Sequence, residues 1–295
     1  LSEGVCAHMP EITVEGLRHV YSPATPFEKV AIDDINLETE HGELVGIIGH
    51  TGSGKSTFIQ HLNALLQPSA GRVLYNGKDI NESKAARRDI KYEIGLVFQY
   101  PEYQLFEETV FADIAFGPKN MKLSESEIKE RVSEAAAFVG IDEDYFDKSP
   151  LELSGGQKRR VAIAGVIAMR PDVLILDEPT AGLDPEGCRQ ILSNICAYRE
   201  ETGSTVFLVS HSMDTVAEIA ERIVVFNKGK IAFNGKPEEV FTHAAELAEM
   251  GLSVPAPTLI AESLRSGGFP IEGAVYTHDR LLNEILRAKG VKKDA

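Results

Sequence analysis

The sequence predicts an α/β fold in which a parallel sheet carries a smaller antiparallel annex. Short apolar runs early in the chain are joined by turn signals such as YNGK, which is typical of antiparallel strands. Later apolar runs alternate with helical patterns, which favours parallel strands. The length of 295 residues, with 43% apolar and 25% charged residues, is typical of a globular protein with a packed core.

Apolar stretches bounded by Gly, Asn or Asp are predicted to form the strands. They span residues 11–20, 30–37, 43–48, 71–75, 94–98, 173–176, 205–209, 223–226 and 230–233. Helices are predicted after Ser124, which forms a capping box with Glu127, and after Asp184, which precedes a proline at the first helical position. Two amphipathic helices, 258–265 and 279–288, are predicted beyond the prolines of MGLSVPAP.

The composition disfavours several classes of function. A net charge of −15 argues against general nucleic-acid binding, because such binding depends on Lys and Arg that neutralise phosphates. No apolar run reaches the ~18 residues of a membrane-spanning helix. The cysteines Cys6, Cys188 and Cys196 fit neither a disulfide framework nor a zinc site, which indicates a reducing compartment. Residues 1–8 are expected to be a non-native leader in front of Met9.

The segment GIIGHTGSGKSTF contains the pattern G-x-x-x-x-G-K-[ST] between an apolar strand and a helical pattern. In such a loop the backbone N–H groups turn inward around a phosphate, and glycines permit the close approach. Lys55 is expected to reach the β- and γ-phosphates, and the Ser56 hydroxyl to bind Mg²⁺. The expected phosphate-binding residues are Gly49, His50, Thr51, Gly52, Ser53, Gly54, Lys55, Ser56 and Thr57.

Two carboxylates end the apolar strand in PDVLILDEPT. Neighbouring residues on a strand point in opposite directions, so we expect different roles for the two. Asp177 is expected to hold Mg²⁺, and Glu178 to orient and deprotonate water. The alternative is that the acidic pair only caps the following turn.

Two further motifs have both a structural and a functional interpretation. In LSGGQ, Ser154 and Gln157 form a helix capping box, and Gly155 and Gly156 leave N–H groups bare for an anion. A nearby phosphate loop favours the anion-binding interpretation over capping alone. His211 follows an apolar strand, where it either contacts a γ-phosphate or has a structural role.

Charge is distributed unevenly along the chain. Residues 100–152 hold 13 Asp and Glu against 5 Lys and Arg. This segment is either a solvated helical face or a docking surface for a basic partner.

Six motifs in this order resemble the nucleotide-binding subunits of ABC transporters. They are GHTGSGKST, Gln99 after a strand, LSGGQ, LILDEP, AGLDP and His211, matching the Walker A, Q-loop, signature, Walker B, D-loop and switch-histidine motifs. GHTGSGKSTFIQHLNALLQP and FQYPEYQLFEETVFADIAFGP resemble more closely the ATPases of energy-coupling factor (ECF) transporters, which power vitamin and transition-metal uptake in prokaryotes. The segment TPFEKVAIDDINL resembles one of the two ATPase types that pair in such complexes.

The resemblance implies a P-loop NTPase fold of the ABC type that binds ATP and Mg²⁺. The ATPase domain would span residues 9–243, with a helical subdomain at about 100–168 and a helical extension at 244–295 for packing or dimerisation. Gln99 would contact Mg²⁺ and the attacking water. Either Tyr21 or Phe27 would stack on adenine, with Tyr21 preferred.

The resemblance also implies partners at the cytoplasmic face of the prokaryotic cell membrane. A second, non-identical ATPase subunit would face this chain head to tail, so that Ser154 to Gln157 act on the partner's ATP and Asp184 lies at the dimer seam. A membrane-embedded T component would dock near Gln99–Asp113, and a substrate-binding S component would be coupled indirectly. The acids expected to hold arginines of the T component are Glu102, Glu107, Glu108 and Asp113.

Two other functions compete with the importer ATPase. A soluble ABC ATPase acting on DNA or the ribosome is disfavoured by the negative charge and by the lack of heptads or a zinc module. A regulatory subunit that binds ATP without hydrolysis is disfavoured by Glu178 and His211.

Overall fold

The computed structural model describes residues 11–290, so the predicted leader at residues 1–8 lies outside the described residues. Two compact units make up this part of the chain. The first unit holds residues 11–43 and 56–207, and the second holds residues 44–55 and 208–290. Between residues 11 and 290, every helix is too short or too polar to cross a bilayer.

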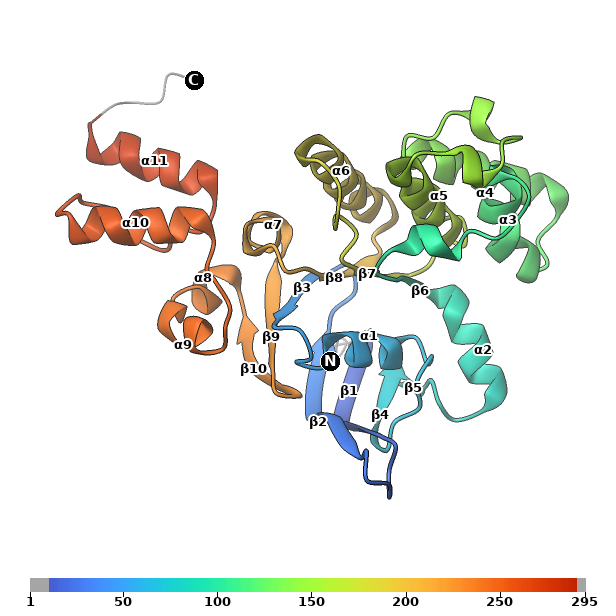
Figure 1. Cartoon of the computed structure of the whole chain (residues 1–295), viewed down its shortest axis with the longest axis horizontal. Helices are drawn as coiled ribbons and strands as arrows, with labels where there is room; N and C mark the ends of the chain where they lie inside the picture. Colours follow the sequence, from blue (N-terminus) through green and yellow to red (C-terminus); the bar gives the residue numbers. More distant parts are fainter. Residues whose placement is uncertain (1–10, 291–295) are drawn as a thin grey trace, which may run out of the picture. The chain divides into compact units, whose positions relative to one another are not determined.

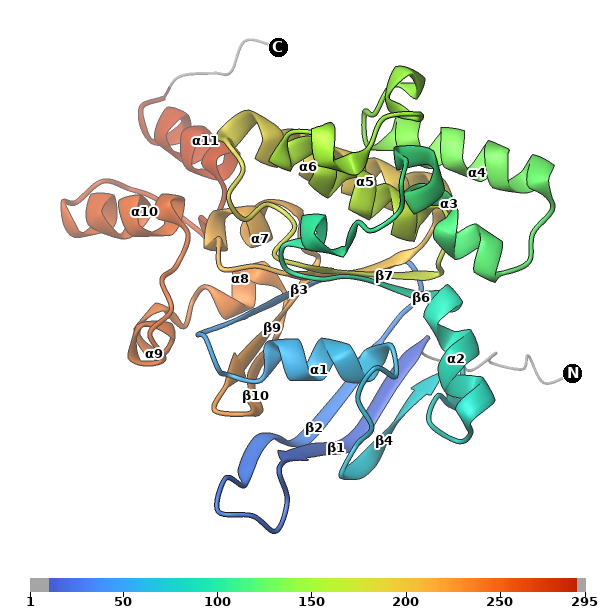
Figure 2. The same ribbon diagram turned by 45° about the vertical axis from the view of Figure 1, so that its right-hand side comes forward.

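The antiparallel annex of the first unit is a sheet with strand order β2-β1-β4-β5, as predicted (Figures 1 and 2). The register of β1 shifts against both neighbours around Gly16, which has a φ of 56°. A Cβ on Gly71 would overlap the carbonyl oxygen of Gly16, so this bulge depends on glycine. The strands are β1 (Ile12–Tyr21), β2 (Lys29–Thr39), β4 (Ala70–Tyr75) and β5 (Lys78–Asp79).

Parallel strands form the second sheet region of the first unit. Strand β6 (Ile94–Val97) pairs in parallel with β7 (Val173–Asp177), and β8 (Thr205–Val209) follows β7 in the strand order. Every residue of β7 is buried, which confirms the interpretation of its apolar run as an interior strand. Strand β8 begins in the first unit and ends in the second.

Helices α3 (Val110–Asn120), α4 (Glu125–Phe138) and α5 (Gly155–Ile167) pack on one another in the first unit (Figure 1). The capping box of Ser124 is present at the start of α4, as predicted. The N-cap at the start of α6 (Pro185–Thr202) is also confirmed. Helix α2 (Lys84–Glu93), which was not predicted, and the 3₁₀ helix η1 (Pro101–Gln104) also belong to the first unit.

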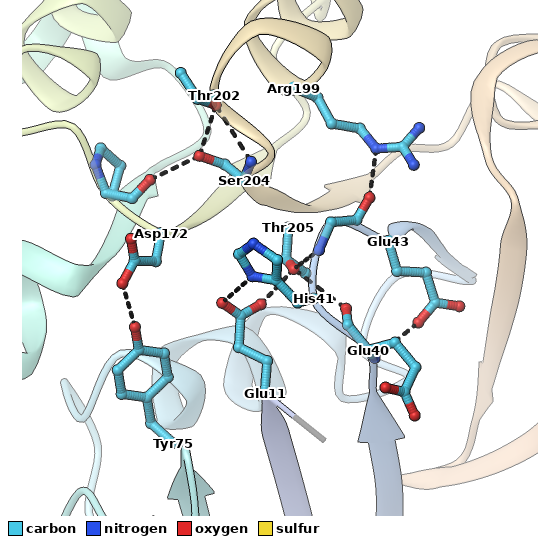
Figure 3. Close-up of polar contacts among 12 residues, drawn as sticks. Glu11, Glu40, His41, Glu43, Tyr75, Asp172, Arg199, Thr202, Ser204 and Thr205 are labelled. Atoms are coloured by element: carbon cyan, nitrogen blue, oxygen red, sulfur yellow. Dashed lines mark hydrogen bonds and ion pairs between the residues drawn. The ribbon is translucent and has the colours of Figure 1, made fainter. Parts of the chain in front are cut away.

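A polar network surrounds the amino-terminal ends of β7 and β8 (Figure 3). Glu11 accepts hydrogen bonds from Thr205 and from Nδ1 of His41, the latter at 3.0 Å. The Tyr75 hydroxyl donates to Asp172, the residue directly before β7, and burial together with this bond raises the pKa of Tyr75. These groups lie at the opposite strand ends from Asp177, and they hold the annex against the parallel strands.

The second unit contains strands in the order β10-β9-β3, with β3 parallel and β10 antiparallel to β9. The predicted C-terminal helices are present as α10 and α11, which lie side by side (Figures 1 and 2). They share a small core of Ala261, Ile271, Val275 and Leu281. The elements of this unit are β3 (Leu44–Gly49), α7 (Met213–Ile219), β9 (Arg222–Asn227), β10 (Lys230–Gly235), α8 (Pro237–Val240), α9 (Ala244–Glu249), α10 (Ala256–Ser266) and α11 (His278–Ala288).

Candidate functional site

In the second unit, a glycine-rich loop lies between the end of β3 at Gly49 and the start of α1 (Lys55–Leu62). Gly52 and Gly54 have φ values of 80° and 111°, and Gly49 has 155°, so all three adopt backbone conformations that other residues rarely reach. A Cβ on Gly49 would also lie 2.5 Å from the carbonyl oxygen of Phe226. The loop therefore has the strand–glycine–helix form that a phosphate cradle needs.

The Lys55 side chain is buried and folds back over this loop. Its Nζ donates to the carbonyl oxygens of Gly49, at 2.5 Å, and His50, at 3.2 Å. A positive charge is thus held at the centre of the loop and at the helix start, where an anion is favoured.

His211 lies between β8 and α7, in the same unit as Lys55. Desolvation, and in second place the charge of Lys55, lowers the pKa of His211 below the ordinary 6.5. The imidazole is therefore mainly neutral at pH 7 and can both donate and accept hydrogen bonds. Helix α7 packs tightly on β3, because a Cβ on Gly46 would overlap Cγ1 of Val216.

In the first unit, the two carboxylates end β7 as predicted, and both residues are buried. Glu178 has a φ of 52°, a left-handed conformation that is strained for a residue with a side chain. Val97 of β6 is paired with Leu176 of β7, so Gln99 and Glu178 each follow their paired strand residue by two positions. Gln99 and the carboxylate pair therefore leave the same edge of the parallel strands.

Side chains of the first unit offer oxygen ligands for a metal ion, although the described residues form no site in which protein groups alone surround the ion. Among residues 11–290, no group of three or more His, Cys, Asp and Glu is arranged to hold a metal ion. Mg²⁺ commonly binds through one or two protein oxygens together with phosphate oxygens. The Ser56 hydroxyl is exposed at the start of α1 and the Asp177 carboxylate ends β7, so each offers an oxygen of the kind that such a shared site uses.

Tyr21 is tied to the helix that follows the phosphate loop. Its hydroxyl lies 3.2 Å from Oγ1 of Thr57, and its ring stands edge-on to His19 at 4.5 Å between centroids. Phe27 is 83% exposed in the following loop. Tyr21 is therefore bonded directly to the helix that follows the phosphate loop.

Two histidines that belong to none of the motifs, His19 and His61, lie behind Tyr21. His61 is fully buried, its Nδ1 lies 3.0 Å from the Leu66 carbonyl oxygen, and its ring lies 4.8 Å from that of His19. Burial, and to a smaller extent the nearby His19, lowers the pKa of His61 to about 4, although the hydrogen bond to the Leu66 carbonyl oxygen opposes the shift. Because a carbonyl only accepts, Nδ1 of the neutral His61 carries the proton.

Helix α5 begins with the capping box that LSGGQ predicts. Oγ of Ser154 accepts from the Gln157 N–H at 3.3 Å, and Oε1 of Gln157 accepts from the Ser154 N–H at 3.0 Å. A Cβ on Gly155 would meet nothing within 4 Å, and one on Gly156 only Leu183 at 3.7 Å. Packing among residues 11–290 therefore gives no reason for glycine at these two positions.

Two of the four acids expected to hold a basic partner are engaged inside the chain, which corrects that prediction. Asp113 is buried and accepts the N–H groups of Phe106 and Glu107 at 3.2 and 3.3 Å. Its burial raises its pKa, while these two bonds oppose the shift. Glu102 forms an ion pair with Arg159. Of the four, only Glu108 is exposed, and Glu107 is partly buried, as Glu102 is.

A groove of about 400 Å³ lies beside this acidic stretch, and its chemistry is largely apolar. Phe106 and Phe116 line it with their rings edge to face at 4.9 Å, and 65% and 42% of these residues are exposed. Arg88 and Lys91 of α2 add positive charge on one side. An apolar helix with a few charges would fit this lining.

Comparison with known proteins identifies the family. The family model described as ABC transporter matches residues 32–181. The energy-coupling factor transporter ATP-binding protein EcfA2 of Caldanaerobacter subterraneus subsp. tengcongensis is 56% identical over 94% of this chain and 96% of that protein. EcfA2 of Clostridium perfringens is 55% identical over 93% of this chain and 97% of its own length.

Solved structures agree with the sequence comparison. CbiO1 of Clostridium perfringens, part of the ABC transporter complex cbiONQ, has a TM-score of 0.72 and 41% identity over 81% of this chain and 94% of its own. The cassette MJ0796, in a dimeric state bound to ADP and phosphate, has a TM-score of 0.69 and 28% identity over 76% of this chain and 98% of its own. The chain therefore belongs to the ABC transporter ATPases and, within them, to the ATP-binding proteins of energy-coupling factor transporters of the EcfA2 type.

Proposed function

We propose that this chain works as one of two ATPase subunits in an ECF importer, and that it couples ATP binding and hydrolysis to uptake of a vitamin or a transition-metal ion. The observation that carries the proposal is the buried carboxylate pair at the end of β7, with Glu178 in a strained conformation. Strain of this kind is kept where function requires a fixed geometry. Similarity to EcfA2 proteins over nearly the whole chain favours this function over a soluble or a regulatory ATPase.

The roles proposed for bound ATP follow from the chemistry of each group. The loop from Gly49 to Thr57 holds the phosphates, with Lys55 supplying charge, and Tyr21 stacks on the adenine. Ser56, Gln99 and Asp177 supply oxygen ligands to Mg²⁺, which neutralises phosphate charge when bound. Glu178 takes the proton of the attacking water, and the neutral His211 forms a hydrogen bond to the γ-phosphate.

A second ATPase subunit is proposed to complete each site. Ser154, Gly155, Gly156 and Gln157 would approach the ATP of that subunit, because the glycines have no packing role within the chain. A cleft of about 350 Å³ lies between this motif and Asp184, the N-cap of α6, and it would lie at the seam. The dimeric state of the related cassette MJ0796 supports the arrangement.

The membrane partner is proposed to dock near Gln99–Asp113, in the groove lined by Phe106 and Phe116. Apolar packing would supply most of the contact there, with Glu107 and Glu108 available to basic residues of the T component. This places the chain at the cytoplasmic face of the membrane as a peripheral subunit, with the S component coupled indirectly. We also propose an ATPase domain at 9–243, with its helical subdomain at about 100–168, and an extension at 244–295 for packing or dimerisation.

The test is the variant Glu178→Gln in the complex with its membrane partners. Glutamine keeps the size of the side chain but removes the base, so ATP hydrolysis is expected to fall by the ~10²–10⁴ typical of lost general-base catalysis. ATP binding should persist and the ATP-bound dimer should accumulate, as seen by gel filtration. Glu249→Gln, at an exposed position on α9, is the matched control and should hydrolyse normally. Near-normal turnover in Glu178→Gln would refute the assignment.

A further inference from the structure

A buried ion pair connects three segments of the first unit that each follow a proposed nucleotide-site residue. Arg159 of α5 has a side chain only 4% exposed, and its partner Glu102 of η1 is 17% exposed. Nη2 of Arg159 donates to Oε1 of Glu102 at 3.0 Å and to Oε2 at 3.2 Å, and Nε donates to Oε2 at 3.2 Å. The geometry is bidentate, which fixes direction as well as distance.

The same guanidinium also reaches the segment beyond β7. Nη1 of Arg159 donates to the carbonyl oxygen of Ala181, and the N–H of Ala181 donates to the carbonyl oxygen of Glu178 at 3.1 Å. One side chain therefore holds the turn that carries the proposed catalytic base.

The role of the ion pair is inferred from where its two residues lie in the sequence. Glu102 lies three residues after Gln99, in the stretch proposed to meet the membrane partner, and Arg159 lies two residues after Gln157 of the signature motif. Burying two charges is costly, and an apolar pair of similar volume is often as stable or more stable. Stability alone therefore gives no reason to place a charge pair here, whereas a directional link between the three segments does.

We propose that Arg159 is a positioning residue that couples the docking segment η1 to the signature helix and to the turn carrying Glu178. A displacement of η1 by the membrane partner moves Glu102, and the bidentate pair passes this movement to Arg159 and to Ala181. The inference rests on the proposed function, since it assigns a pathway to the same coupling.

The experiment compares the double variant Arg159→Met/Glu102→Leu with the native protein, in the isolated ATPase pair and in the complete complex in lipid vesicles. The double variant leaves no unpaired charge, so its melting temperature and its KM for ATP should remain close to native. The stimulation of kcat by the membrane partner, and transport per ATP, should fall by roughly 10²-fold, the effect of a misplacement of about 1 Å at a reacting centre. A purely structural pair would not produce this split between KM and kcat.

Two further variants are compared with the double variant. Arg159→Lys keeps the charge but lacks the planar fork, so it is expected to fold and to remain poorly coupled. The control Arg72→Met/Glu15→Leu removes an exposed ion pair of the annex, with its atoms at 2.6 Å, and should couple normally. Native stimulation in Arg159→Met/Glu102→Leu would overturn the inference alone. Absence of ATP hydrolysis and transport in the native complex would instead overturn the proposed function.

Discussion

At the scale of single residues, motif residues could be assigned from the sequence, but the partners of charged residues could not. The roles proposed for Lys55 and Asp177 come from local patterns; in the structure Lys55 is buried at the start of α1, and Asp177 is the last residue of β7. The acidic excess gave no sign that Asp113 faces two N–H groups or that Glu102 faces Arg159. Arg159 is 57 residues from Glu102 in the chain, and charge counting cannot detect such a pairing.

The buried His61 predicts a specific pH dependence of stability. Its pKa in the folded chain is about 4 against 6.5 for an ordinary histidine, so the unfolded chain binds its proton at higher pH. The stabilisation is complete above pH 6.5 and decreases as the pH falls toward 4, by about 3 kcal/mol in the free energy of unfolding. Urea titrations between pH 7 and pH 4 measure this loss.

The control for this prediction is His61→Asn, because asparagine retains a donor toward the Leu66 carbonyl oxygen and does not titrate. The variant should lose about 3 kcal/mol less than the native protein over the same pH range. An identical pH dependence in the two proteins would contradict the role of His61.

At the scale of elements, helices and strands with a uniform sequence pattern were predicted well, and those with a mixed pattern were not. The apolar run of β7 and the caps of α4 and α6 were predicted correctly, because each depends on neighbours in the sequence. Helix α2 was missed because its sequence KAARRDIKYE is mostly polar, and only Ile90 is buried. The apolar groove beside α3 was also missed, because residues as far apart in the sequence as Phe106 and Met169 line it together only in the folded chain.

The docking groove predicts how charge reversal affects assembly. Glu107→Lys/Glu108→Lys replaces two negative charges next to Phe106 in the sequence, a lining residue of the groove, with positive ones, so it should weaken binding of a basic membrane partner. Each lost charge contact at an accessible rim is worth about 0.2–1 kcal/mol, so co-purification should fall several-fold while ATP binding by the isolated subunit stays intact. The control is Asp144→Lys/Asp147→Lys, at exposed positions elsewhere in the acidic segment. Equal recovery of the partner with both variants would exclude a specific role for Glu107 and Glu108.

At the scale of the whole molecule, the chain divides its proposed chemistry between two units. The phosphate loop and His211 belong to the second unit, and Asp177, Glu178 and the signature motif belong to the first. This division could not be predicted from the motifs, because their order along the chain does not follow the boundary, which crosses both α1 and β8. The small helical extension was predicted, whereas its separate core was not.

Because α10 and α11 have a separate core, we expect a destabilising substitution there to affect only these two helices. Leu281→Ala removes a buried side chain from this core and should cost about 2–5 kcal/mol of local stability. Hydrogen exchange measured by mass spectrometry should increase within α10 and α11 and remain unchanged in the phosphate loop, with ATP hydrolysis retained. Leu282→Ala, on an exposed neighbouring position, should leave the exchange unaltered. Faster exchange in β3 of Leu281→Ala would show that the extension supports the rest of the unit.

The contact between Gly46 and Val216 also limits how this sequence can diverge. Even a methyl group at position 46 would push α7, and with it His211, away from the strand that leads into the phosphate loop. Alanine at position 46 would therefore need a smaller residue at position 216, and it would still lie 3.1 Å from Cβ of Ala220. Positions 46 and 216 together set the distance between a helix and a strand, so we expect the effects of substitutions at the two positions to be coupled.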